Sequence, residues 1–201
     1  MRCLKSVRVY FYLCLLLGWS LNASAQADSK AISGHIDVIH LNESQQNGQL
    51  LLDAQGDIAL SAGLLEALAK GITLYFRTDI EVRQLKSGLM RWHQPIVTRI
   101  DYLTELSYSR FYQRYTLVNQ RNGNVQHFQD LQQALNTLTR LQSVALVAMN
   151  QLHPGLNYQI RLRFSVDYWQ LNAPLLTHAL FHREWRLTSD WHYTPIQLGR
   201  L

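Results

Sequence analysis

Two histidines four residues apart have the spacing of a zinc-binding pair. His178 and His182 follow Pro174, a residue favoured in the first turn of a helix, so both imidazoles are expected on one helical face. A zinc site needs a third protein ligand, and the nearest candidates in the sequence are Glu184 and His192. Because no H-E-x-x-H motif accompanies the pair, we interpret both histidines as surface residues and predict neither a metal nor another cofactor.

Asp79 and Glu81 form a carboxylate pair at positions i and i+2 of a predicted strand. Strand rise places them about 6.6 to 7 Å apart, which lies within the separation that inverting glycosidases use. Arg77 and Arg83 bracket the pair and favour the ionised form of both acids, whereas a general acid needs a raised pKa. We therefore expect a solvated charge ladder here, and no catalytic residue.

Arginine accounts for 13 of the 16 basic residues that follow residue 25. Six lie on the polar sides of predicted strands: Arg77, Arg83, Arg99, Arg161, Arg163 and Arg186. If neighbouring strands bring them together, their guanidinium groups form an array of bidentate donors for a carboxylate or phosphate, with Arg161 and Arg163 as the first candidates for a clamp. The alternative, which we weigh more heavily, is cross-strand pairing with acids: Asp79, Glu81, Asp101, Asp167 and Asp190.

Tryptophan side chains offer a second kind of binding surface. Trp169 lies on the outer side at the end of a predicted strand, which makes it a candidate for contacting a sugar or a peptide. Trp185 and Trp191 share the inner side of another predicted strand, so we expect both to pack in the core.

Alternation of apolar and polar residues predicts the strands that must position these side chains. The strongest segments are residues 74–83, 96–108, 158–168 and 185–193. Weaker segments are residues 36–41, 49–54, 112–118 and 144–149. Three dipeptides typical of short hairpins separate strands: Asn47-Gly48, Ser87-Gly88 and Asn122-Gly123.

Helical spacing interrupts the strand pattern in two places. Ser61 is the expected N-cap of one helix, and Asp130 is the expected N-cap of a second, whose core-facing stripe runs to Leu141. A short third helix is expected over residues 174–182. The sequence therefore predicts a mainly β (α+β) fold: one antiparallel β-sandwich-like domain of about seven or eight strands with two packed helices and a short third.

Residues 1–25 have the parts of a secretory signal peptide: three basic residues, an apolar run from Val9 to Leu21, and small residues ending at Ala25. The run has 13 residues. At about 1.5 Å per residue it is too short for a bilayer core of about 30 Å. We expect cleavage after Ala25, a single globular domain over residues 26–201, and a periplasmic protein without a membrane span.

The segment after residue 25 has 16 basic and 14 acidic residues. Such a small positive excess does not favour a nucleic acid as partner. Cys3 and Cys14 both lie in the predicted signal peptide, so the mature chain would have no disulfide and no thiolate nucleophile. The sequence also has no G-x-S-x-G, G-x-G-x-x-G or P-loop motif.

Several segments in the second half of the chain are similar to one family. They are Phe111-Tyr112-Gln113-Arg114-Tyr115-Thr116-Leu117, Phe128 with Leu131 and Ala134-Leu135, Tyr158 with Arg161-Leu162-Arg163, and Trp185-Arg186-Leu187-Thr188-Ser189-Asp190-Trp191. Over about residues 35–195 the chain resembles the bacterial domain-of-unknown-function family 4390. The family's Leu-Pro-x-Pro-Leu segment corresponds to residues 171–175, which keep only the second proline, Pro174. The resemblance implies an exported proteobacterial protein and hints at a role in envelope sensing.

These features favour a non-catalytic binding or adaptor module that recognises an anionic ligand or an envelope protein. The candidate ligand contacts are Arg161, Arg163, Arg77, Arg83, Arg186 and Trp169. The alternative is a hydrolase of envelope polymers, either metal-assisted through His178 and His182 or carboxylate-based through Asp79 and Glu81.

Overall fold

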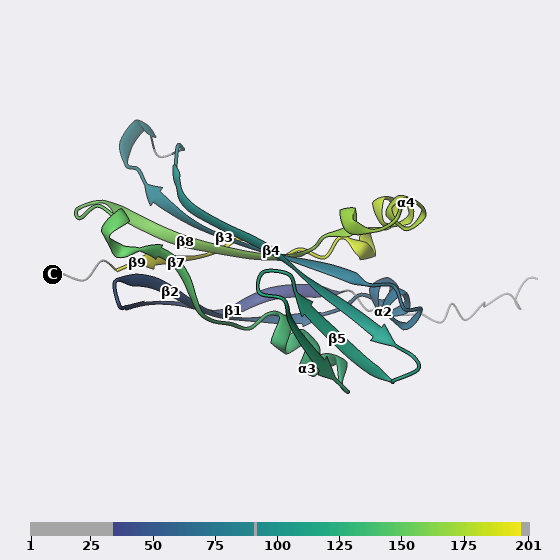
Figure 1. Ribbon diagram of the computed structural model, residues 1–201. Helices are drawn as coiled ribbons and strands as arrows, with labels where there is room; N and C mark the ends of the chain where they lie inside the picture. The colour runs from purple at the N-terminus through teal and green to yellow at the C-terminus, as the bar shows by residue number, and fades with distance from the viewer. Residues whose placement is uncertain (1–33, 91, 198–201) are drawn as a thin grey trace, which may run out of the picture. The chain divides into compact units, whose positions relative to one another are not determined.

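The computed structural model describes residues 34–90 and 92–197, which form mainly antiparallel β structure in two sheets (Figure 1). The first sheet has the order β1–β2–β7, with β1 (His35–Gln46), β2 (Gln49–Ala59) and β7 (Leu141–Ala148). The second has the order β6–β5–β4–β3–β8–β9, with β6 (Asn124–Phe128), β5 (Arg114–Asn119), β4 (Ile96–Ser109), β3 (Leu74–Leu85), β8 (Asn157–Val166) and β9 (His192–Ile196). This confirms the predicted mainly β, sandwich-like fold, with nine strands among the described residues. The predicted signal peptide lies outside them.

Alternating residues give the two sheets one hydrophobic core. Along β3, Phe76, Ile80 and Val82 are buried on one face together with Thr78, while the charged residues between them point to the other face. Leu162 of β8 and Leu50 of β2 belong to the same buried cluster. Burial of each such side chain contributes about 1.5–3 kcal/mol. A shift of one residue in strand pairing would expose these apolar side chains, so the buried face fixes the register of β3 and β8. The same register sets the positions of the charged residues on the other face.

Two of the three predicted hairpin dipeptides join adjacent strands. Asn47 and Gly48 have φ angles of 51° and 72° and connect β1 to β2, as a tight turn with two left-handed residues requires. Asn122-Gly123 lies between β5 and β6. Ser87-Gly88 does not form a short hairpin, because Gly88–Met90 make the 3₁₀ helix η1 within a longer connection from β3 to β4.

The predicted caps begin the first two helices. Ser61 Oγ accepts a hydrogen bond from Leu64 N at the start of α2 (Ala62–Ala69), and Asp130 Oδ2 accepts one from Gln133 N (2.9 Å) at the start of α3 (Leu131–Leu138). Leu141 does not continue the second helix, because Thr139 ends it and donates its hydroxyl to Gly56 O of β2 (2.9 Å).

The third helix is α4 (Ala173–Phe181), close to its predicted range. Three further short 3₁₀ helices are η2 (Met149–Gln151), η3 (Tyr168–Gln170) and η4 (Arg183–Trp185). Within the described ranges, each helix is too short or too polar to cross a membrane.

The predicted strand over residues 185–193 is wrong in its extent and in the side that Trp191 occupies. An isolated bridge pairs Ser165 with Thr188, whereas β9 pairs Arg161 with Tyr193, so the register shifts by one residue between them. Trp185 is buried as expected. The shift carries Trp191 to the outer face instead of the core, because one extra residue reverses the side of every later residue.

Candidate functional site

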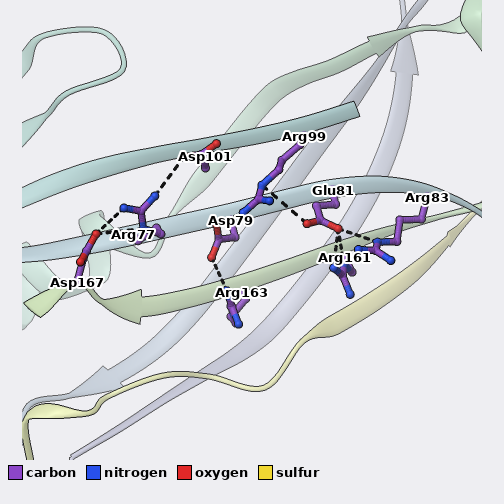
Figure 2. A network of polar contacts seen from close by, with 9 residues as sticks. All are labelled: Arg77, Asp79, Glu81, Arg83, Arg99, Asp101, Arg161, Arg163 and Asp167. Atoms are coloured by element: carbon purple, nitrogen blue, oxygen red, sulfur yellow. Dashed lines mark hydrogen bonds and ion pairs between the residues drawn. The ribbon is translucent and has the colours of Figure 1, made fainter. Parts of the chain in front are cut away.

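Nine charged residues line the outer face of the six-stranded sheet, and we call them the charge ladder (Figure 2). They are Arg77, Asp79, Glu81, Arg83, Arg99, Asp101, Arg161, Arg163 and Asp167. The central strand β3 supplies two of the acids, and the register sets arginines of β4 and β8 beside them. The ladder therefore has five arginines against four carboxylates.

Glu81 is the most heavily bonded acid of the charge ladder. Its side chain is only 3% exposed, and its Oε2 accepts hydrogen bonds from Arg83 Nε and Arg161 Nε, both at 2.7 Å (Figure 2). Burial by itself would raise the pKa of Glu81, but the bonds and charges of these two arginines outweigh burial and lower it. A lowered pKa does not suit a general acid.

Asp79 lies beside Glu81 and is equally inaccessible. Arg163 Nη2 donates to its Oδ2 at 2.8 Å, while Arg99 Nη2 lies 3.6 Å from its Oδ1, beyond hydrogen-bond distance. The relative exposure of Asp79 is 0% and that of Glu81 is 2%. The expected solvated ladder is therefore wrong in one respect: arginine side chains from three strands cover the acids and exclude water from them.

Arg77 anchors the other end of the charge ladder. Its Nε donates to Asp167 Oδ2 and its Nη1 to Asp101 Oδ2, both at 3.2 Å. The hydrogen bond to Asp167 is the largest cause that raises the pKa of Arg77, and burial opposes it. Asp167 Oδ1 also accepts a bond from Trp169 N (3.1 Å), which fixes η3 against the ladder.

Trp191 covers two arginines of the charge ladder. Its ring centroid lies 3.9 Å from Arg161 Cζ and 4.4 Å from Arg163 Cζ, which is the geometry of a cation–π contact. Each guanidinium thus contacts a carboxylate of β3 and the face of an indole. Arg161 uses both its Nε and its Nη2 on Glu81, whereas Arg163 donates through Nη2 alone, and its buried Nε has no partner among the described residues.

The structure brings together four of the six predicted ligand contacts: Arg77, Arg83, Arg161 and Arg163. Arg186 is not among them, because its Nη2 donates to Leu180 O. Trp169 is 64% exposed, as the sequence indicated, but its role in binding stays a prediction. The clamp formed by Arg161 and Arg163 also stays a prediction.

The histidine pair lies on and after α4. His182 is exposed at the N-cap of η4, and the side chain of His178 is outside the described part of the chain. Among residues that the structure describes, no three His, Cys, Asp or Glu side chains gather where they could hold a metal ion.

A second polar region lies where β4 and β5 face α3 and β7. Two adjoining cavities of about 220 and about 410 Å³ share five lining residues, and we call the combined space the amide groove. The shared residues are Tyr102, Asn119, Asn122, Arg140 and Gln142. The edge strand β7 forms one wall, and β4 with the β5–β6 turn forms the other.

Five carboxamide side chains line the amide groove: Asn119, Asn122, Asn124, Gln126 and Gln142. Asn119 and Asn122 use their side-chain oxygens to accept backbone N–H bonds within the β5–β6 turn. Within the described residues, the amides of Asn124, Gln126 and Gln142 make no side-chain hydrogen bond, so they remain able to donate and accept.

The charge of the amide groove is positive. Arg121 and Arg140 line it, and no carboxylate does among the described lining residues. Arg121 Cζ lies 5.8 Å from the Tyr102 ring centroid, and Arg140 Nε donates to Gln55 Oε1 (3.0 Å). Burial raises the pKa of the Tyr102 phenol. Beyond Arg140, an adjoining cavity contains Asp53, whose Oδ1 accepts a bond from Ser143 N (2.8 Å).

No motif in the sequence indicates the amide groove. The dipeptide Asn122-Gly123 predicted the turn that contributes its wall, but no motif links that turn to Arg140 and Gln142. The sequence contains only a weak indication of this site: Arg121 and Arg140 lie outside the alternating strand segments, so strand pairing does not account for their charge. Their proximity depends on the packing of the two sheets.

The family described as "Domain of unknown function (DUF4390)" matches residues 33–194, a range that includes the charge ladder and the amide groove. No curated protein and no solved structure matches the chain. The family match covers most of the chain and confirms the resemblance seen in its sequence segments. The chain therefore belongs to the DUF4390 family.

Proposed function

We propose that this chain is an exported, non-catalytic binding module of the bacterial envelope and that its amide groove recognises an anionic ligand. The observation that carries the proposal is the charge of the groove lining, which includes Arg121 and Arg140 and no carboxylate among the described residues. A polar cleft with one sign of charge attracts ligands of the opposite sign.

The two groove arginines keep donors available for such a ligand. Arg140 engages Gln55 through Nε, and its Nη groups make no hydrogen bond within the described chain. The Arg121 guanidinium contacts the Tyr102 ring and no carboxylate that the structure describes. A planar guanidinium with open donors binds a carboxylate or phosphate in bidentate fashion.

The non-catalytic assignment is supported by the burial of Asp79 and Glu81, the carboxylate pair that the sequence suggested as a catalytic pair, and by the pKa of Glu81. The pKa of Glu81 is lowered, and arginine side chains cover both Glu81 and Asp79. A carboxylate-based hydrolase needs one acid with a raised pKa and access for the substrate.

A capture experiment tests the proposal. The immobilised protein is incubated with a cell-envelope extract at about 0.05 M and about 0.5 M salt, and captured proteins and glycans are identified by mass spectrometry. Three forms are compared: wild type, Arg121→Gln/Arg140→Gln, and the control Lys70→Gln/Arg183→Gln, which removes two exposed positive charges elsewhere.

We expect wild type and control to capture the same anionic material at low salt, and we expect the groove variant and high salt to abolish the capture. The proposal fails if the three forms retain the same set, or if wild type retains nothing. Export is tested separately, by mass spectrometry of the N-terminus of the protein from the periplasm, where residue 26 should be first.

A further inference from the structure

Carboxamides dominate the polar lining of the amide groove, and this limits the kind of anion that fits. A carboxamide offers one acceptor oxygen and two donor hydrogens in one plane, and a hydroxyl group both donates and accepts. The amides of Asn124, Gln126 and Gln142 have no side-chain partner in the described chain. They match a ligand that is rich in hydroxyl groups better than a simple anion, which only accepts.

A threonine hydroxyl adds to this polar lining. Thr104 is 6% exposed, lines the smaller cavity, and makes no side-chain hydrogen bond within the described chain. Thr137 lines the same cavity but donates its hydroxyl to Gln133 O (2.9 Å). The Thr104 hydroxyl therefore remains able to donate to and accept from a ligand in this cavity.

Charge and polarity together point to one ligand class. We propose that the anionic ligand of the amide groove is an acidic saccharide, a sugar chain that carries carboxylate groups. This inference rests on the proposed function. The carboxylates pair with Arg121 and Arg140, and the hydroxyls bond to the free carboxamides and Thr104. The larger cavity, about 410 Å³, is within the range of small-ligand pockets.

An acidic peptide is the competing ligand, and the shape of β7 disfavours it. A peptide would add to this edge strand as a further strand, which requires a regular row of backbone groups. Ser143 has a φ of 47°, and the pairing of β7 with β2 changes register twice, beside Ser143 and beside Leu146. Bulges of this kind protect a strand edge from further pairing.

Three probes distinguish these ligands: trigalacturonate, its neutral methyl ester, and triglutamate. Each is titrated into the ¹⁵N-labelled protein and followed by NMR chemical shifts. We expect trigalacturonate to bind at least about tenfold more tightly than either of the others, a difference of about 1.4 kcal/mol. The largest shifts should occur at Asn124, Gln126, Gln142 and Arg140.

Two variants separate hydroxyl recognition from charge. Gln126→Met/Gln142→Met keeps the charge and most of the shape of two exposed side chains but removes their hydrogen bonds. It should lower the affinity for trigalacturonate about tenfold with an unchanged salt dependence. Arg121→Gln/Arg140→Gln should lower both the affinity and its salt dependence.

Each result decides the inference. Equal or tighter binding of triglutamate would assign the groove to acidic peptides and overturn the saccharide class. Absence of trigalacturonate binding, or binding that the methionine variant leaves unchanged, would also overturn it. In those cases the proposed function still stands if the extract experiment shows capture that depends on Arg121 and Arg140, so the two failures are distinguishable.

Discussion

The charge ladder and the amide groove are both rich in polar side chains, but they use them in opposite ways. In the ladder, five arginines and four carboxylates pair with one another across three strands, Trp191 covers two of the arginines, and Asp79 Oδ1 and Arg163 Nε are buried without a hydrogen-bond partner among the described residues. In the groove, two arginines line a cavity without a carboxylate among its described residues, and three amides have no side-chain partner.

The difference shows that a concentration of charge is a poor guide to binding when both signs lie on one sheet face. Arginines that are bonded to buried acids act as parts of the fold, because displacing them would leave the acids uncompensated. Polar groups around a cavity are available to a ligand only where neighbouring groups have not already used them.

Removing one buried acid should give a large loss of stability for a single substitution. Glu81→Gln keeps the shape of the side chain but leaves Arg83 and Arg161 without their shared anion. Breaking a fully buried pair costs about 3–5 kcal/mol, and since these arginines are partly exposed we expect a loss of about 2–3 kcal/mol. Urea denaturation measures it.

The matched groove variant is Gln142→Met, which should change the free energy of unfolding by less than about 0.5 kcal/mol. Equal effects of Glu81→Gln and Gln142→Met would contradict the contrast between the two regions.

Arg161→Gln/Arg163→Gln tests whether the charge ladder is structure or a ligand clamp. The change removes hydrogen bonds to both buried acids and the cation–π contacts with Trp191, while glutamine can still donate one bond. Because two buried carboxylates lose arginine partners, we expect stability to fall by about 3–5 kcal/mol. Capture from the envelope extract, measured under conditions where the variant is folded, should not change. A smaller captured set would support the clamp predicted from the sequence.

A feature of these regions can be predicted from the sequence when the residues that determine it are close together in the chain. The alternation over β3 and β8 correctly predicts which residues face outward, and Ser61 and Asp130 correctly predict two helix starts. These features depend on neighbours within a few residues. The strand β6 was not predicted, because four of its five residues are exposed and it has no apolar alternation.

Three other features required the assembled fold. The burial of Asp79 and Glu81 depends on arginines about 80 residues away that register places beside them. The outward position of Trp191 depends on one extra residue before β9, which alternation alone does not reveal. The amide groove depends on how β4 and β7 pack, which a single sequence does not specify.

Acid should destabilise the protein through the charge ladder. The pKa of Glu81 is lower in the folded chain than its ordinary value of 4.5. Ionised Glu81 therefore stabilises the fold above pH 4.5, and this contribution is lost as the pH falls through the folded-state pKa. We expect the wild-type stability to fall more steeply than that of Glu81→Gln below this pH. Parallel curves in thermal denaturation from pH 6 to about 3 would contradict the assignment.

The smallest effect is expected at Arg99, the ladder arginine that most resembles those of the groove. Its side chain is 51% exposed, and it lies 3.6 Å from Asp79 Oδ1 and 3.9 Å from Glu81 Oε1, too far for a hydrogen bond. Exposed ion pairs contribute about 0–1 kcal/mol and are weakened by salt. Arg99→Gln should therefore lower the free energy of unfolding by less than about 0.5 kcal/mol, and the difference should vanish in about 0.5 M salt. A loss as large as that of Arg161→Gln alone, unchanged by salt, would mean that Arg99 is a full partner of the buried acids and that no arginine of the ladder is free to bind.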